Sequence, residues 1–242
     1  SRKLAIIGPC GLDDSGAVHE FIERVSDQTK NLNHSIKIVY RMPPLKPRTT
    51  IGWRGLESES LLEAHSTLVK VANGGHAIAI ELLSPSQGTY YADLLAMQWI
   101  GARNVTDQNV RLQASTMPEI PTLVKNGMFG EVTSSAQAMV AINSPHKHVT
   151  ILGDDGMIQT VHTDGGNAAG IILRGEQDHS GVQVHNITPE AVQRALHAMS
   201  KNSISGYGVV VDASHSNGAA FSGGSKSASG QTKAAEATIE LM

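Results

Sequence analysis

Short apolar runs alternate with amphipathic stretches along the whole chain. The first run, at 4–8, is followed by apolar residues at helical spacing from Val18 to Leu32, which predicts a strand, a loop and a helix. The same pattern predicts strands at 36–40, 77–83, 100–105, 122–125, 171–173 and 208–212. Helices are predicted between them at 61–72, 90–97, 107–115, 134–142, 188–199 and 233–242. Strands that alternate with helices in this way form parallel βαβ units.

One segment interrupts the alternation. The apolar stretches at 149–152 and 157–161 flank Asp154-Asp155-Gly156. An Asp-Gly pair between alternating apolar residues is a strong signal for a tight turn between two antiparallel strands. We therefore expect a β-hairpin insertion at 149–161.

The number of βα units limits the architecture. Seven of them are too many for two unrelated small domains, so a (β/α)8 barrel or an open doubly wound sheet remains. The length of 242 residues and the apolar content of 40% are sufficient for a large core. In a barrel, the functional side chains stand just after each strand, at its carboxyl end.

Basic side chains stand at these strand ends, although the chain carries a net charge of −3. They are Arg41, Lys46, Arg48, Arg103, Lys125 and Arg174. Taken singly, each is compatible with a solvated surface residue. At one rim they would repel one another without a polyanion between them, and guanidinium groups bind carboxylate or phosphate through two hydrogen bonds. As a set they favour a ligand with several negative charges, such as one or two phosphates.

Cys10 follows the first predicted strand and His215 follows the seventh. A thiolate and an imidazole can share a divalent metal ion. They can equally form a nucleophilic Cys–His pair, or be a buried cysteine and a histidine that bonds a neighbouring carbonyl. Their spacing alone does not decide among these three interpretations.

Composition narrows the classes of partner and compartment. The pI near 6.4 gives no general attraction to nucleic acid or to an anionic membrane. Cys10 is the single cysteine, so no intramolecular disulfide can form, and 1–10 lacks the ordered regions of a signal peptide. We expect a cytoplasmic protein with no nucleic-acid or membrane partner.

Seven motifs follow one another along the chain. They are Gly-Pro-Cys at 8–10, Lys-Pro-Arg-Thr-Thr-Ile-Gly-Trp-Arg-Gly-Leu at 46–56, Tyr-Ala-Asp-Leu at 91–94, Ile-Gly-Ala-Arg at 100–103, Lys-Asn-Gly at 125–127, Ile-Ile-Leu-Arg-Gly at 171–175 and Asp-Ala-Ser-His-Ser-Asn at 212–217. In type and order they resemble the class I 3-deoxy-D-arabino-heptulosonate 7-phosphate (DAHP) synthases of the tyrosine-, phenylalanine- and tryptophan-sensitive type.

The resemblance implies a single barrel domain over 1–242 and a transferase reaction. In that reaction phosphoenolpyruvate condenses with erythrose 4-phosphate at the start of the shikimate pathway or of a related secondary pathway. The resemblance also implies a divalent metal ion, namely Mn2+, Fe2+, Co2+ or Zn2+, and a homo-oligomer, either a dimer or a tetramer.

The resemblance also implies a role for each matching residue. Phosphoenolpyruvate would be bound by Arg41, Glu81, Gly101, Ala102, Arg103, Lys125 and Arg174. The erythrose 4-phosphate would be bound by Lys46, Pro47, Arg48 and Thr49. Cys10 and His215 would be two of four protein ligands of the metal ion, and Lys46 is the candidate proton donor to the aldehyde oxygen.

Two departures from the family pattern keep alternatives open. Pro43-Pro44-Leu45 replaces an aromatic and an acidic residue near the aldehyde, which would permit a related synthase that uses another phosphorylated sugar. In the family, strand eight and the loop after it supply the remaining two metal ligands, a glutamate and an aspartate. We expect 233–242 to be helix seven and Glu240 to be helical, so strand eight and helix eight are absent from this sequence. A non-catalytic relative that binds phosphoenolpyruvate is the third possibility.

Overall fold

The computed structural model describes residues 3–32, 35–44, 46–48, 52–54, 61–153, 155–204 and 207–242. The chain divides into two compact units. Unit 1 comprises Ser1–Leu83 and Gln87–Gln98, and unit 2 comprises Ser84–Ser86 and Trp99–Met242. Within the described residues, no helix combines the length and the apolar character needed to cross a membrane.

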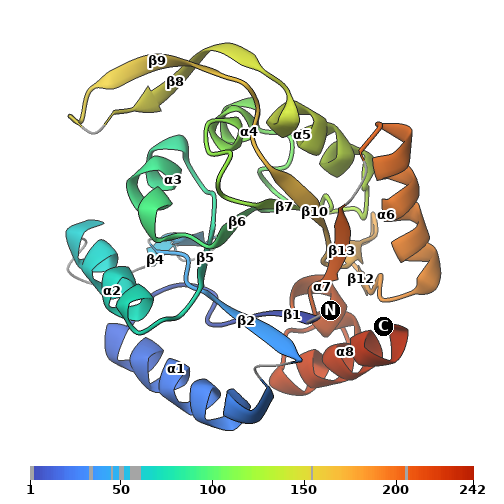
Figure 1. Cartoon of the computed structure of the whole chain (residues 1–242). Coiled ribbons are helices and arrows are strands. Elements are labelled where there is room, and N and C mark those ends of the chain that lie inside the picture. The colour runs from blue at the N-terminus through green and yellow to red at the C-terminus, as the bar shows by residue number, and fades with distance from the viewer. Residues whose placement is uncertain are drawn as a thin grey trace. The chain divides into compact units, whose positions relative to one another are not determined.

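The first unit is built from parallel strands and the helices that follow them. Its elements are β1 (Lys3–Ile7), α1 (Ser15–Thr29), η1 (Lys30–Leu32), β2 (Ile36–Arg41), β3 (Lys46–Arg48), β4 (Gly52–Arg54), α2 (Leu61–Asn73), β5 (Ile78–Glu81) and η2 (Ala92–Leu94). In the parallel pairs, Ile7 lies opposite Tyr40 and Arg41 lies opposite Ala79. Figure 1 shows α1 and α2 on one side of these strands. The short strands β3 and β4 form a separate antiparallel pair.

Local signals explain the helix α1 and the core of unit 1. The Asp14 side chain accepts a hydrogen bond from Ala17 N at 3.0 Å, which caps the first turn. Val18 and Ile22, four residues apart, face inward and are buried. They belong to a core that also contains Leu12, Tyr40, Met42, Ala64, Leu68, Val71, Ile78, Ile80 and Tyr91.

Unit 2 continues the alternation. Its elements are α4 (Gln108–Ser115), β7 (Thr122–Lys125), α5 (Thr133–Asn143), β8 (His146–Leu152), β9 (Ile158–Thr163), β10 (Ala168–Leu173), β11 (Glu176–Gln177), β12 (Gln183–Val184), α6 (Pro189–Lys201), β13 (Gly208–Val211), α7 (His215–Ala220) and α8 (Ala228–Leu241). The helices α5 and α6 run along one side of β10 and β13 (Figure 1). All four residues of β7 are buried, as is typical of a strand covered on both faces.

The predicted hairpin is confirmed. The strands β8 and β9 pair antiparallel, with Val149 opposite Val161 and Leu152 opposite Ile158, and both extend a few residues beyond the expected bounds. Gly156 has φ 77°, a left-handed conformation that the tight turn requires. Asp154 lies outside the described residues.

The fold is mixed α/β with one parallel sheet of seven strands in the order β1-β2-β5-β6-β7-β10-β13. Most predicted elements match, including α6, where the Thr188 side chain accepts from Ala191 N at 3.2 Å and Pro189 begins the helix. Glu240 lies in α8, so the expectation that it is helical is confirmed.

The prediction for 90–105 was wrong. The helix α3 (Pro85–Tyr91) begins earlier than expected, and β6 (Met97–Ile100) ends where the strand was expected to begin. Gln98 is fully buried within β6, so a polar residue occupies a core position of a strand, and the apolar pattern placed 98 in neither the helix at 90–97 nor the strand at 100–105. The segment 102–106 forms turns.

Candidate active site

Three neighbouring strands of unit 2 deliver charged side chains at their carboxyl ends. Lys125 is the last residue of β7, Arg174 follows β10 and Asp212 follows β13. The Lys125 Nζ lies 2.7 Å from Asp212 Oδ2, and both side chains are at most one tenth exposed. This ion pair joins two strands that are separated by β10 in the sheet.

His215 contacts the same carboxylate. Its Nδ1 lies 2.9 Å from Asp212 Oδ2. Its φ is 51°, which is uncommon for a residue with a side chain and often marks a functional position. The first residue of the short helix α7 is thus held in an unfavourable backbone conformation, with its ring against Asp212.

The charges in this cluster set the protonation states. Burial alone would raise the pKa of Asp212, but Lys125 and then His215 outweigh it and hold that pKa well below its usual range. Burial lowers the pKa of His215 to about 4, against the opposing attraction of Asp212. At neutral pH the cluster therefore contains a carboxylate, an ammonium group and a neutral imidazole.

Arg174 adds a second nearly buried cation. Its side chain lies close to Met128, with Nη1 3.6 Å from the sulfur, and the residue is 6% exposed. Its positive charge contributes to the lowered pKa of His215, so the guanidinium lies near the imidazole. Two buried cations from the neighbouring strands β7 and β10 make this rim suitable for an anion.

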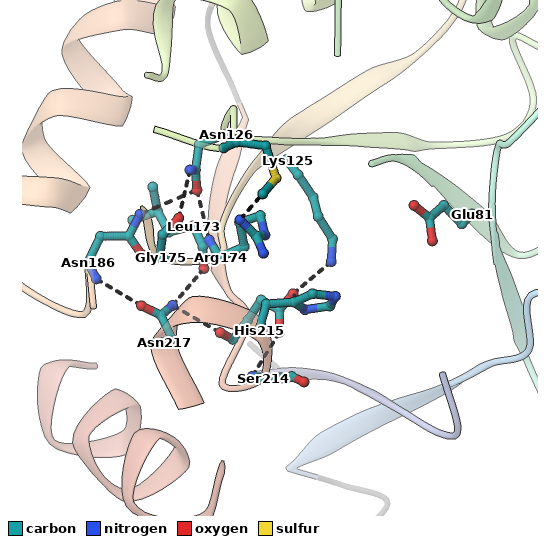
Figure 2. Close-up of polar contacts among 12 residues, drawn as sticks. Glu81, Lys125, Asn126, Leu173, Arg174, Gly175, Asn186, Ser214, His215 and Asn217 are labelled. Carbon is teal, nitrogen blue, oxygen red and sulfur yellow. Dashed lines mark hydrogen bonds and ion pairs between the residues drawn. The ribbon is translucent and has the colours of Figure 1, made fainter. Parts of the chain in front are cut away.

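Three buried asparagines lie beside Arg174, on one side of these groups (Figure 2). Asn126, Asn186 and Asn217 are each at most 3% exposed. Asn126 and Asn217 occur in the motifs described above, but their role was not predicted, and Asn186 was not singled out at all. Most of their hydrogen bonds run to segments far away in the sequence, which no local pattern reveals.

The third group of expected anion ligands follows β6. Gly101 is buried in the turn after the strand, and its carbonyl accepts from Asn104 N at 3.0 Å. Arg103 is exposed, and among the described residues no hydrogen bond or ion pair joins it to Lys125 or Arg174. Sequence reasoning missed Arg111, which is 8% exposed and donates from Nε to Val105 O at 2.7 Å, holding the end of this turn.

Unit 1 carries the other expected residues. Lys46, on β3, forms a close ion pair with Glu81, the last residue of β5. Glu81, which the resemblance assigns to phosphoenolpyruvate, is thus the ion-pair partner of Lys46, the candidate proton donor. Pro47 and Arg48 lie on β3, but their side chains, like the whole of Thr49, lie outside the described residues.

Two further expected residues lie at the ends of β1 and β2. Arg41 ends β2 and is half-buried, and Cys10 is exposed in the bend after β1. Gly8 has φ 149°, and a Cβ atom there would lie 2.3 Å from the carbonyl oxygen of Arg41. Glycine at position 8 therefore allows the Arg41 backbone to approach the loop that carries Cys10.

The expected metal ligands belong to different units, Cys10 to unit 1 and His215 to unit 2. Within the described part of the chain, no three His, Cys, Asp or Glu side chains are grouped so as to hold a metal ion. His215 alone fits the role, because metal-bound histidines commonly have their other ring nitrogen against a carboxylate.

The sequence is similar to those of several known proteins. Residues 1–235 match the model of the DAHP synthetase I family. The chain is 32% identical over 227 residues to phospho-2-dehydro-3-deoxyheptonate aldolase of Corynebacterium glutamicum, covering 89% of this chain and 59% of that protein. It is 30% identical over 229 residues to the Tyr-sensitive enzyme of that name in Escherichia coli, covering 89% and 61%.

The fold is also similar to that of a solved structure. The phospho-2-dehydro-3-deoxyheptonate aldolase of Francisella tularensis superimposes with a TM-score of 0.86 at 28% identity, over 99% of this chain and 69% of that one. The present chain spans about three fifths of the length of the curated relatives it matches.

Proposed function

Because this chain belongs to the DAHP synthetase I family, we propose that it condenses phosphoenolpyruvate with erythrose 4-phosphate to give DAHP and phosphate. The observation that carries the proposal is a cluster of four side chains at the ends of adjacent strands, namely Lys125, Arg174, Asp212 and His215. All four lie within the residues that match the family model. The proposed reaction is the first step of the shikimate pathway.

The phosphoenolpyruvate would bind in unit 2. Lys125 and Arg174 would take its phosphate and carboxylate, with Arg103 and the backbone at Gly101 and Ala102, and Arg41 of unit 1 would add a further cation. Buried cations bind an anion more tightly than exposed ones, because water competes less for it. They also stabilise negative charge as C3 of the enol phosphate attacks the aldehyde, water adds at C2 and phosphate leaves.

The aldose phosphate would bind to the segment that begins at Lys46. Arg48 and Thr49 would take its phosphate, with Pro47 between them and Lys46. The carbonyl oxygen of the aldehyde becomes an alkoxide as the new carbon–carbon bond forms, and the Lys46 ammonium would donate a proton to it. Glu81 supports this role because it holds the ammonium group in place by an ion pair.

A divalent metal ion, Mn2+, Fe2+, Co2+ or Zn2+, would be held by Cys10 and His215 as part of its ligand set. Cysteine sulfur and histidine nitrogen suit all but the hardest of these ions. When bound, the ion would polarise the aldehyde oxygen as a Lewis acid. Support within the chain comes from the contact of His215 Nδ1 with Asp212, which orients the ring.

We further propose that the seven parallel strands are those of a (β/α)8 barrel in one domain over 1–242. The sheet order and the superposition on the Francisella tularensis structure support it. In this proposal, 1–242 does not include strand eight and helix eight of that architecture. A cytoplasmic homo-oligomer, dimer or tetramer, completes the proposal.

Phosphate release measured with the purified protein tests this function. We expect release to require both phosphoenolpyruvate and erythrose 4-phosphate, to stop with EDTA and to return with added Mn2+. The control is a panel of other phosphorylated aldoses. Turnover with another aldose in place of erythrose 4-phosphate, or binding of phosphoenolpyruvate without any turnover, would contradict the proposal.

A further inference from the structure

We infer that Asn126, Asn186 and Asn217 are positioning residues that fix the phosphoenolpyruvate-binding cations Lys125 and Arg174. The inference rests on the proposed function and names the residues that make its anion site rigid. The three side chains form one buried network, which we call the asparagine network, and Figure 2 shows it beside the charged groups.

Asn126 uses its amide completely within the protein. Its Nδ2 donates to the carbonyl oxygens of Gly127 at 2.7 Å and Gly175 at 3.0 Å. Its Oδ1 accepts from Arg174 N at 2.8 Å and from Asn186 Nδ2 at 3.3 Å. An amide can donate two hydrogen bonds and accept two, so Asn126 has no capacity left for a ligand.

Asn186 and Asn217 extend the network to two more segments. Asn186 Oδ1 accepts from Gly175 N at 2.8 Å, and the Asn186 backbone N donates to Asn217 Oδ1 at 2.8 Å. Asn217 Nδ2 donates to the carbonyl oxygens of Leu173 at 3.1 Å and Asp212 at 2.9 Å. The loop before α6 is thereby joined to the ends of β10 and β13.

Every charged group of the cluster touches this network or lies beside it in the chain. Arg174 is fixed on both sides, because its N donates to Asn126 Oδ1 and its carbonyl accepts from Asn217 N at 3.2 Å. Lys125 directly precedes Asn126, and the Asp212 carbonyl is bonded to Asn217. The amides therefore act on the backbone from which the charged side chains project.

The packing around the network leaves little room for adjustment. Gly175 has φ 80°, and a Cβ atom there would lie 2.5 Å from Asn217 N. The residue after Arg174 is thus pressed against α7 in a conformation that favours glycine. Because buried amides without partners are costly, loss of one asparagine would displace the others as well.

A role in positioning makes a different prediction from a role in stability alone. Displacement of Lys125 and Arg174 would weaken the binding of phosphoenolpyruvate, whose anionic groups they hold. The binding of the aldose phosphate depends on Lys46 and its neighbours in unit 1 and would be unaffected. Asn186 is the best position to test, because it is distant in sequence from all the charged residues.

The experiment compares Asn186→Ala with Asn143→Ala. Asn143 lies at the opposite end of β10, where its Oδ1 accepts from Ala168 N at 2.8 Å and its Nδ2 donates to Tyr207 Oη at 3.2 Å. For Asn186→Ala we expect the KM and Kd of phosphoenolpyruvate to rise about tenfold, because small displacements of binding groups weaken the interactions that they make with a ligand. The KM of erythrose 4-phosphate should stay unchanged. In Asn143→Ala the Tm should fall and both KM values should stay at the wild-type level.

Asn186→Asp provides a second variant if the alanine variant does not fold. It keeps the size of the side chain and the acceptor for Gly175 N, but loses the donor to Asn126. The same selective rise in the KM of phosphoenolpyruvate is expected.

If Asn186→Ala and Asn186→Asp both show wild-type turnover and an unchanged KM of phosphoenolpyruvate, this inference is overturned and the proposed function stands. An equal rise in the KM values of both substrates would also overturn it. A wild-type protein that does not bind phosphoenolpyruvate at all would overturn the proposed function, and this inference with it.

Discussion

Two lysines proposed for the same reaction are held in different ways. Lys125 ends β7, a buried strand of the seven-stranded sheet, and its neighbour Asn126 belongs to the asparagine network. Lys46 begins β3, a strand of three residues that pairs with β4 in a separate two-stranded sheet. Each lysine is paired with a nearly buried carboxylate, Asp212 or Glu81.

The difference indicates what each carboxylate has to do. A strand within a large sheet is fixed by its neighbours, so Asp212 mainly balances the charge of Lys125. A two-stranded sheet is marginally stable by itself, so β3 fixes Lys46 less firmly. Glu81 stands on the large sheet and ties Lys46 to it. Substitutions of Lys46, Asp212 and Glu81 can test this division of roles.

The largest effect is expected for Lys46→Met. Loss of a proton donor typically reduces turnover by about 10²- to 10⁴-fold. The Kd of phosphoenolpyruvate, measured by calorimetry, should stay at the wild-type value because Lys125 and Arg174 remain. The exposed Lys70 on α2 provides the control, and Lys70→Met should be fully active. Near-normal turnover of Lys46→Met would show that Lys46 takes no part in the chemistry. The comparison of Lys46 with Lys125 would then not concern catalysis.

The second effect concerns Asp212→Asn. The substitution leaves the buried Lys125 without its carboxylate partner, and loss of one member of a buried pair costs about 3–5 kcal/mol of unfolding free energy. Urea unfolding followed by circular dichroism measures it. Asp164 is exposed in the same unit, so Asp164→Asn should leave the stability unchanged. Equal stability of the two variants would show that Asp212 does not balance the charge of Lys125.

Sequence patterns predicted the parts of this site that depend on local structure. The apolar run at 122–125 gave β7 with its bounds, and Lys125 stands at its end as expected. The Asp-Gly pair and the Thr188-Pro189 pair gave the β8–β9 hairpin and the start of α6. In each case the signal is a property of neighbouring residues: the apolar period, a turn conformation or a helix cap.

The parts that were missed depend on contacts between distant segments. The position of β6 was wrong because Gln98 is buried within it. Asp212 belongs to the motif at 212–217, but its pairing with Lys125 joins residues 87 positions apart. Asn186 stands alone in a loop, and its one local signal is that a helix begins three residues later. Such contacts become visible only once the strands are placed side by side.

The smallest effect is expected for Glu81→Gln, which makes in unit 1 the change that Asp212→Asn makes in unit 2. Like the asparagine of Asp212→Asn, the glutamine can still accept a hydrogen bond from the lysine but carries no charge. Because the Lys46 and Glu81 side chains are more exposed than those of Lys125 and Asp212, the unfolding free energy should fall by only about 1–2 kcal/mol. The kinetic effect should be selective: a looser Lys46 raises the KM of erythrose 4-phosphate and lowers kcat, while the KM of phosphoenolpyruvate stays constant.

Glu23, exposed on α1 in the same unit, provides the matched control, and Glu23→Gln should change neither constant. A rise in the KM of phosphoenolpyruvate instead would return Glu81 to the phosphoenolpyruvate site, where the family resemblance places it. It would also mean that β3 holds Lys46 without help from the large sheet. Lys46 and Lys125 would then both be fixed by the strands that carry them, and the two units would differ only in which carboxylate pairs with the lysine.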